Sequence, residues 1–191
     1  MVLPTVPFGV QTGQIDIPLC INMNPSTQYA VLRDVVESLA VQGVDRLVIL
    51  NGHGGNDFRQ MVRELSLDVP AVFLTVVNWY HVLDGSKYFD EPGDHAGEME
   101  TSLMLEAAPE LVRPLASAGP GTERKPVLRA MRQGWAWTPR PWTKVTDDTG
   151  VGDPSAATAE KGRRFVQALT DELAAFLDEL GEADLEKLYA E

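Results

Sequence analysis

Two of the three histidines of this chain lie in short glycine-rich segments that could carry chemistry. His53 lies in the segment Asn51–Asn56 (NGHGGN), and His95 opens the segment His95–Ser102 (HAGEMETS), which also holds Glu98. Imidazole and carboxylate groups are ligands for divalent metals such as zinc, and an imidazole that titrates near neutral pH can also move protons. These residue types indicate a partial metal site, with His95 as a further ligand or as a general acid–base.

The same residues also have purely structural interpretations. Glu98 and Glu100 fall in the first turn of a predicted helix, where the helix dipole favours carboxylates without any ligand. A lone histidine in a turn is more often packed than catalytic, but the glycines beside His53 remove bulk around a polar group, which favours a site. His81 follows a predicted strand directly, and we interpret it as structural or interfacial.

The segments before these motifs predict a parallel sheet. Residues 47–50 (LVIL) are continuously apolar, as in a strand covered on both faces, and a second buried strand is predicted at 71–77. Apolar residues recur at helical spacing in 25–43 and again in 58–65. Strands and helices alternating at this pitch predict right-handed βαβ units, which place the His53 turn at the carboxyl end of a strand.

Local signals predict where these elements begin and end. Asn24 and Pro25 are typical of a helix cap and first helical residue, Gly43 is typical of a helix stop, and Asn56 is a candidate cap for the next helix. Residues 2–9 are interpreted as a short strand leading into a loop. The aspartates near glycine or proline are interpreted as turn formers: Asp16, Asp147, Asp148 and Asp153.

The second half of the chain is expected to be less regular. A helix is predicted from Glu98 to about Leu111, and a C-terminal helix over 155–181. Residues 113–150 are rich in glycine, proline and basic residues, and we expect a long irregular excursion with one short helix. Its tryptophans either cover a substrate or form an oligomer contact, since this residue is favoured in both settings: Trp135, Trp137 and Trp142.

Composition restricts the class of protein. A chain of 191 residues is most economically one domain, residues 1–191, and its net charge of −12 argues against nucleic acid or an anionic membrane as partner. The lone Cys20 excludes a disulfide framework and a thiolate metal cluster. No apolar run approaches the ~20 residues that span a bilayer, and the N-terminus lacks a signal-peptide pattern. We therefore expect a cytoplasmic protein, while a small-molecule substrate is implied by a family resemblance.

Both motifs resemble the internal signatures of the creatininase family of metal-dependent amidohydrolases. Pro7–Gly9 and residues 149–162 resemble further family positions, so the resemblance covers nearly the whole chain. It implies a three-layer α/β/α domain with a mostly parallel sheet, assembled as a homohexamer. It also implies two divalent ions (zinc, manganese or iron) at the carboxyl ends of the strands, where a metal-activated water hydrolyses the C–N bond of an amide, lactam or formamide.

The resemblance also assigns residue roles. His53 and Glu98 match metal ligands, and His95 matches the histidine that handles protons during the reaction. Neighbouring polar residues would orient these groups: Asn51, Asn56 and Glu100. No substrate-binding residue is identified.

The chain departs from the family pattern in two places. Members that act on creatinine carry a bulky aromatic residue after the first histidine and a Trp-Asp pair before the second, where this chain has Gly54 and Glu91-Pro92. Creatinine is therefore not the expected substrate. The family also carries a Glu-x-His pair in its first strand and loop, followed by a metal-bridging Asp, and no Glu-x-His occurs in this sequence.

We accordingly expect a creatininase-like domain that lacks the first strand and loop and leaves an apolar sheet edge exposed. The 191-residue chain is expected to bind fewer than one zinc or manganese per chain and not to hydrolyse amides. The resemblance implies a hydrolytic lineage, and whether this chain is itself an enzyme stays open at this point. Two alternatives remain: a lactone or cyclic-ketone hydrolase that uses the same site, and a non-catalytic binding or assembly subunit.

Overall fold

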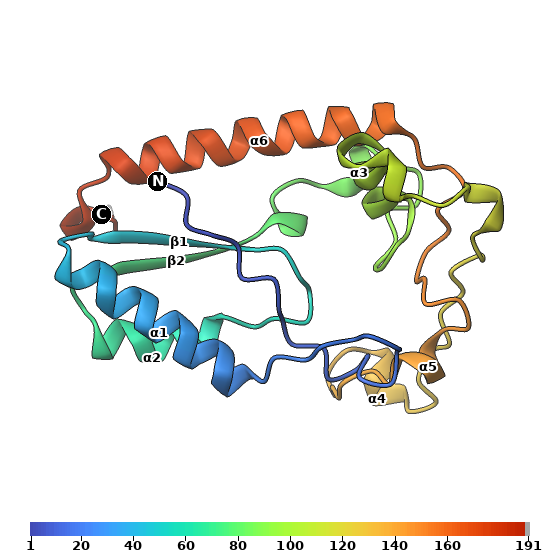
Figure 1. The fold of residues 1–191 in the computed structure, drawn as a ribbon, viewed down its shortest axis with the longest axis horizontal. Helices are drawn as coiled ribbons and strands as arrows, with labels where there is room; N and C mark the ends of the chain where they lie inside the picture. Colours follow the sequence, from blue (N-terminus) through green and yellow to red (C-terminus); the bar gives the residue numbers. More distant parts are fainter. Residues whose placement is uncertain (190–191) are drawn as a thin grey trace.

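The computed structural model describes residues 1–189, and two parallel strands lie at its centre (Figure 1). Strand β1 (Arg46–Asn51) pairs with β2 (Phe73–Asn78) from the Arg46–Phe73 pair to the Asn51–Asn78 pair. The two strands predicted at 47–50 and 71–77 are thereby confirmed, with slightly shifted ends. Because the strands are parallel and in register, Asn51 and Asn78 end side by side.

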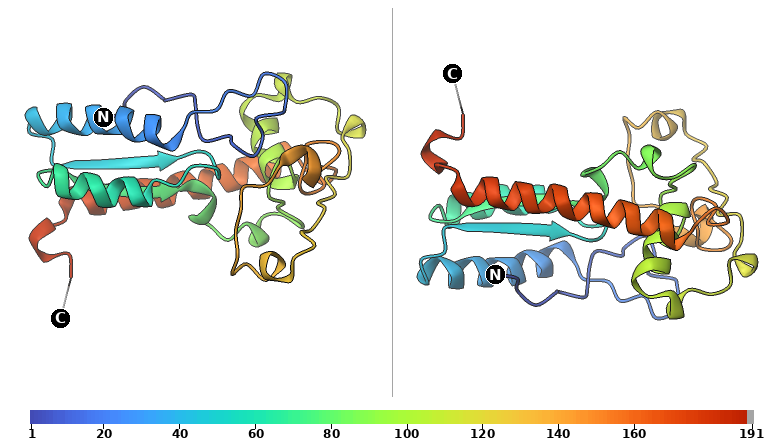
Figure 2. Two further views of the ribbon diagram at one scale, coloured as in Figure 1. Left: turned by 90° about the horizontal axis from the view of Figure 1, so that it is seen from below. Right: turned by 90° about the horizontal axis from the view of Figure 1, so that it is seen from above.

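Helices cover both faces of this strand pair, which gives the predicted α/β/α layering. Helices α1 (Pro25–Val41) and α2 (Arg59–Asp68) lie on one face, and the long α6 (Ala159–Glu182) runs along the other (Figures 1 and 2). The first face holds a core cluster that joins both helices to β2: Val36, Leu65, Val72 and Leu74. As predicted, α1 is followed by Gly43 in the left-handed conformation, with φ of +77°.

The expected strand over residues 2–9 is wrong. Residues 1–8 are exposed, and the backbone bridge nearest this segment joins Gly9 to Asn22. Pro4 and Pro7 have no N–H to donate, and residues 1–8 form no backbone ladder with either strand, so periodicity alone does not make a strand here.

β1 is also less covered than a central strand should be. Within residues 1–189 it pairs with β2 alone, so its other edge is unpaired, and Leu50 is 58% exposed. The continuous apolar run is therefore only half buried, in keeping with the exposed edge expected from the sequence.

The second half contains one short and one long helix joined by an irregular excursion. Helix α3 (Glu98–Ala107) ends four residues earlier than predicted, and a 3₁₀ turn follows at Pro109–Leu111. The excursion holds two short helices instead of one, α4 (Arg129–Arg132) and α5 (Trp142–Val145). Further 3₁₀ turns are Trp79–His81, Gly85–Lys87, Leu115–Ser117 and Leu185–Lys187. None of the helices within residues 1–189 is both long and apolar enough to cross a membrane.

Helix α6 starts four residues later than predicted and crosses α3 at very short range. Thr158 caps α6 by accepting from the backbone N–H of Lys161, and its own N–H donates to Ser102 Oγ of α3. At this crossing, a Cβ atom on Gly162 would lie 2.1 Å from the carbonyl oxygen of Ser102. Only glycine allows the two helices to approach this closely.

We expect Gly162→Ala to lower the free energy of unfolding by about 1–3 kcal/mol, because the added methyl group forces the helices apart. The matched control is Gly181→Ala in the same helix, where a Cβ would meet no atom within 4 Å. This control should gain about 0.5–1 kcal/mol from helix propensity. Urea denaturation of both variants and the unmodified chain measures the two effects, and equal stabilities of the two variants would contradict the close crossing.

Candidate functional site

The His53 turn is tied to the ends of both strands by a cluster of amide side chains. Asn51, buried at the end of β1, accepts hydrogen bonds at Oδ1 from the backbone N–H of His53 (3.1 Å) and from Asn56 Nδ2 (3.0 Å). Its Nδ2 donates to Asn78 Oδ1 at the end of β2 (2.8 Å). Asn51 and Asn56 are therefore hydrogen-bonded within the histidine turn, and their role in orienting a catalytic or metal-binding group stays a prediction. The expectation that Asn56 caps α2 is wrong, because Phe58 occupies the cap position.

The N-terminal segment closes over this turn. His53 Nε2 lies 3.0 Å from the carbonyl oxygen of Val10, and Asn56 Oδ1 accepts from the Val10 N–H at 2.9 Å. Gln28, a buried residue of α1, donates from Nε2 to the same Asn56 oxygen at 3.0 Å. Sequence reasoning missed Gln28, although a polar residue one turn before Leu32 on the apolar stripe was an available signal.

The space beside the imidazole is filled by the chain itself. A Cβ atom on Gly55 would lie 2.4 Å from His53 Nε2 and 2.4 Å from the Val10 oxygen, so this glycine makes room for the ring and for Val10. At Gly52 and Gly54 a Cβ would meet nothing within 4 Å. Gly52 and Gly54 are exposed and open to solvent, whereas Gly55 is packed against the ring, so the predicted space for a ligand beside the imidazole is not found at Gly55 and elsewhere stays a prediction.

We expect Gly55→Ala to break the contact between His53 and Val10 and to lower the free energy of unfolding by about 1–3 kcal/mol. Gly54→Ala is the control, since its methyl group points into open space. Shifts of the His53 ring signals in NMR spectra, together with faster proteolysis near Val10, should appear in the first variant alone. An unperturbed His53 signal in Gly55→Ala would refute this packing.

The second motif is held by a short antiparallel bridge. The backbone of His95 exchanges hydrogen bonds with Val151 (3.0 and 2.8 Å), which joins the motif to the loop before α6. The partly exposed His95 ring packs edge-on against Trp142, with ring centroids 5.1 Å apart, and its Nδ1 lies 3.9 Å from Glu100 Oε2. Trp142 is buried and packs against His95. It therefore does not act as the substrate cover or oligomer contact expected from the sequence.

Three glycines let the loops around His95 touch through their backbones. A Cβ on Gly97 would lie 2.9 Å from the Gly93 Cα, and one on Gly152 would lie 2.6 Å from the same atom. Between these glycines, Ala96 takes a left-handed φ of +49°, and its N–H donates to Glu100 Oε2 at 2.7 Å. Glu100 thus accepts a hydrogen bond from the His95 loop, and its role in orienting the site stays a prediction.

Asp148 fixes the loop that carries Val151. Its carboxylate accepts from the N–H groups of Gly121 (3.0 Å) and Gly150 (3.1 Å) and from Thr146 Oγ1 (2.8 Å), which confirms it as a turn former. Burial alone would raise the pKa of Asp148, but these hydrogen bonds outweigh burial and lower its pKa below the ordinary value.

We expect Asp148→Asn to cost about 1 kcal/mol of unfolding free energy at neutral pH, because a charged acceptor of several hydrogen bonds is lost. Since folding lowers the pKa of Asp148, its contribution is complete above the ordinary value of 3.8 and is lost as the pH falls below it. The difference between the variant and the original chain should therefore shrink in acid. Urea denaturation at pH 7 and pH 3 tests this, with the exposed Asp178→Asn as control; a gap that stays constant would contradict it.

Glu98 is the most buried acidic group of the site, at 1% exposure. Its Oε2 accepts from the backbone N–H of Glu91 at 2.8 Å, and its Oε1 forms an ion pair with Lys161 Nζ from the first turn of α6. Lys161 also donates to Asp90 Oδ2 (2.9 Å) and to the carbonyl oxygen of Ala156 (3.1 Å). The bond to Glu98, followed by that to Asp90, raises the pKa of Lys161. Sequence reasoning missed Lys161, which looks like an ordinary exposed helix residue.

The structure does not bring the two predicted metal ligands into one cluster. His53 bonds to Val10 and Glu98 to Lys161, and across residues 1–189 no three His, Cys, Asp or Glu side chains converge where they could hold a metal ion. As arranged, these residues do not fit the two-metal centre that the resemblance implies. The assignment of His53 and Glu98 as ligands stays a prediction.

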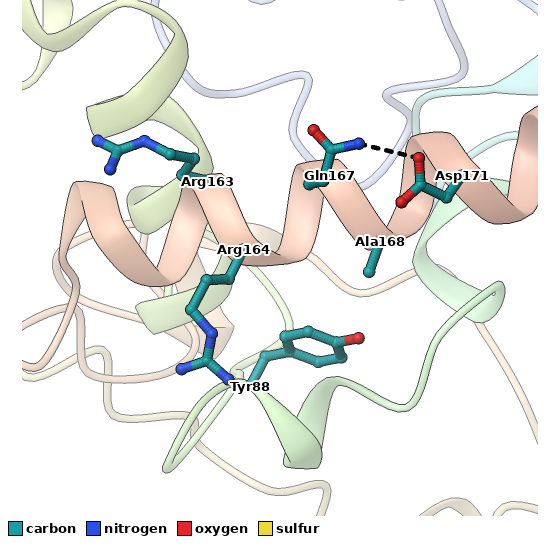
Figure 3. Close-up of a pocket in the computed structure, with 6 residues that line it drawn as sticks. All are labelled: Tyr88, Arg163, Arg164, Gln167, Ala168 and Asp171. Atoms are coloured by element: carbon teal, nitrogen blue, oxygen red, sulfur yellow. Dashed lines mark hydrogen bonds between the residues drawn. The ribbon is translucent and has the colours of Figure 1, made fainter.

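A shallow surface pocket of 430 Å³ lies apart from both motifs, between α6 and the turn before α3 (Figure 3). Arg164 extends toward the Tyr88 ring there, whereas Arg163 points away and pairs with Glu106 and Glu160. The pocket shares no residue with either motif; its lining is Tyr88, Arg163, Arg164, Gln167, Ala168 and Asp171.

Comparison with known proteins shows which proteins this chain is similar to. A mycofactocin precursor peptide peptidase of Mycobacterium ulcerans is 35% identical over 176 residues, which cover 90% of this chain and 63% of that protein. The chain thus spans less than two thirds of the length of this relative. A protein assigned as a creatinine amidohydrolase from Bacteroides fragilis is 45% identical, with a TM-score of 0.91 over 97% of this chain and 74% of that one.

A manganese creatininase has the same fold at 20% identity, with a TM-score of 0.74 over 94% of this chain and 76% of that one. The family model for creatininase, described as creatinine amidohydrolase, matches residues 1–177. With both signature motifs at the carboxyl side of this parallel strand pair and a family match over most of its length, the chain belongs to the creatininase family.

Proposed function

We propose that the protein hydrolyses a C–N bond in a peptide or peptide-like amide and does not act on creatinine. The open space at Gly54 carries this proposal. Creatinine-specific members are expected to have a bulky aromatic residue at this position, whereas here a Cβ would meet no atom within 4 Å. An extended substrate fits such an opening better than a small ring held between aromatic groups. The mycobacterial relative, itself named a peptidase, points to the same substrate class.

His95 is the residue proposed to move protons during this reaction. Its ring is partly exposed, so a substrate can reach it, while Trp142 and Glu100 limit its orientation. An imidazole held in this way can donate a proton to the departing amine after accepting one from the attacking water. A manganese form in the family supports a divalent metal in related proteins. No step is assigned to a metal here, because His53 and Glu98 are committed to other partners.

The proposal also covers the oligomeric state of the protein. We propose a homo-oligomer, by analogy with the family. The exposed Trp135 (70%) and Trp137 (85%) are the candidates for an oligomer contact or a substrate cover. The buried ion pair at Glu98 favours the alternative of a non-catalytic subunit, and so does the bond between His53 and Val10.

The test uses the product of the complete reading frame that contains these residues. Incubated with short peptides, a formamide, a lactone and creatinine, it should release amine from peptides and leave creatinine intact, as followed by mass spectrometry. His95→Ala should lower kcat by about 10²–10⁴-fold. His81→Ala is the control, because His81 is exposed and contacts only the Tyr80 ring among the aromatic groups of residues 1–189.

Preferential cleavage of creatinine or the lactone would overturn the proposed substrate class, and full activity of His95→Ala would overturn the role of His95. A folded protein that cleaves none of these compounds would favour the binding subunit.

A further inference from the structure

The buried carboxylate of Glu98 already has a cation. We propose that Lys161 is the resident counter-ion of Glu98 in this chain, and that its ammonium group keeps divalent metal ions off this carboxylate. The proposal concerns metal binding at one side chain, so it stands independently of the substrate class proposed above.

Burial makes a counter-ion at Glu98 necessary. The side chain is 1% exposed, and an isolated carboxylate with so little contact with water is strongly destabilising. Glu98 is the first residue of α3, so the helix dipole supplies part of the compensation, and the N–H of Glu91 supplies a hydrogen bond. Among residues 1–189, the one cationic side chain within salt-bridge distance of Glu98 is Lys161, which lies against Oε1.

The surroundings of Lys161 are complete for an ammonium group. Such a group has three protons to donate, and Lys161 Nζ has three acceptors: Glu98 Oε1, Asp90 Oδ2 and the carbonyl oxygen of Ala156. Two of these acceptors carry negative charge. The ammonium therefore lies in a built site and is not merely a surface lysine near an acid.

The position of Lys161 follows from the crossing of α3 and α6. Its neighbour Gly162 lies directly against Ser102, and the Thr158 hydroxyl caps the turn by accepting from the N–H of Lys161. Glu98 and Ser102 lie one helical turn apart on α3, so the contact that seats Gly162 also brings Lys161 to Glu98.

A divalent ion would need the place that the ammonium occupies. Metal–carboxylate bonds are about 2.0–2.2 Å long and require a free oxygen lone pair with room beside it. In Glu98, Oε1 faces Lys161 and Oε2 faces the Glu91 N–H. Each oxygen keeps a second lone pair, but the side chain is 1% exposed, so little room remains beside it while Lys161 is in place. His53, the other predicted ligand, is bonded instead to the carbonyl oxygen of Val10.

The experiment compares Lys161→Met, which keeps most of the aliphatic stem, with Arg163→Met, which removes an exposed cation two residues away. Zinc and manganese are the probes, and binding is measured by equilibrium dialysis with elemental analysis. The unmodified 191-residue chain and Arg163→Met should bind less than one ion per chain, and metal should not shift their Tm. Lys161→Met should have a lowered Tm that added metal raises again, and at equal metal concentration it should bind several-fold more metal than the unmodified chain, through the carboxylates of Glu98 and Asp90. The double variant Lys161→Met/Glu98→Gln should lose this metal response.

If Lys161→Met does not fold, the unmodified chain and Glu98→Gln decide the question. With Lys161 present, both should take up the same small amount of zinc or manganese. A full equivalent of metal on the unmodified chain that disappears in Glu98→Gln would overturn the proposal. So would a folded Lys161→Met variant with neither metal uptake nor metal-dependent stabilisation.

Discussion

The close approach of α3 to α6 is the contact on which the second half of the structure depends. It is a contact between backbones, made possible by the missing side chain at Gly162, and Ser102 reinforces it by accepting a hydrogen bond from Thr158. Once the helices are in this register, Glu98 and Lys161 face each other. The loop that leads into α3 carries His95, so the same contact also sets where the imidazole lies.

The two motifs of the site are held by different physical means. Neutral amides fix the His53 turn, with Asn51 at the end of β1 as the central acceptor and donor. The His95 loop depends instead on steric fit among Gly93, Gly97 and Gly152, and on the carboxylates of Glu100 and Asp148. The amide side chains do not titrate, whereas the loop around His95 is held by carboxylates that accept backbone hydrogen bonds.

Local patterns were enough to predict much of the fold. Apolar runs and helical spacing located both strands and four of the helices, and Gly43 marked the end of α1, because these signals depend on residues close in sequence. The strand predicted at 2–9 failed, since a strand needs a partner that periodicity does not provide. The roles of Gln28 and Lys161 were missed for the same reason: their partners, Asn56 and Glu98, are 28 and 63 residues away. The sequence motifs identified His53 and Glu98. They did not reveal that the Val10 carbonyl oxygen bonds to His53 or that the Lys161 ammonium group pairs with Glu98.

The unpaired edge of β1 has a consequence for how copies of this chain behave in solution. Its backbone N–H and C=O groups offer a template for another strand, and its carboxyl half, Val48–Leu50, carries no charge to discourage pairing. The charged residue of β1, Arg46, lies at the other end of the strand, where it bonds to Asp45 and to the carbonyl oxygen of Ala183. The net charge of −12 opposes such pairing by a long-range repulsion, which added salt screens within about 8 Å at physiological ionic strength. Strand pairing between copies at this edge should therefore become more favourable as the ionic strength rises.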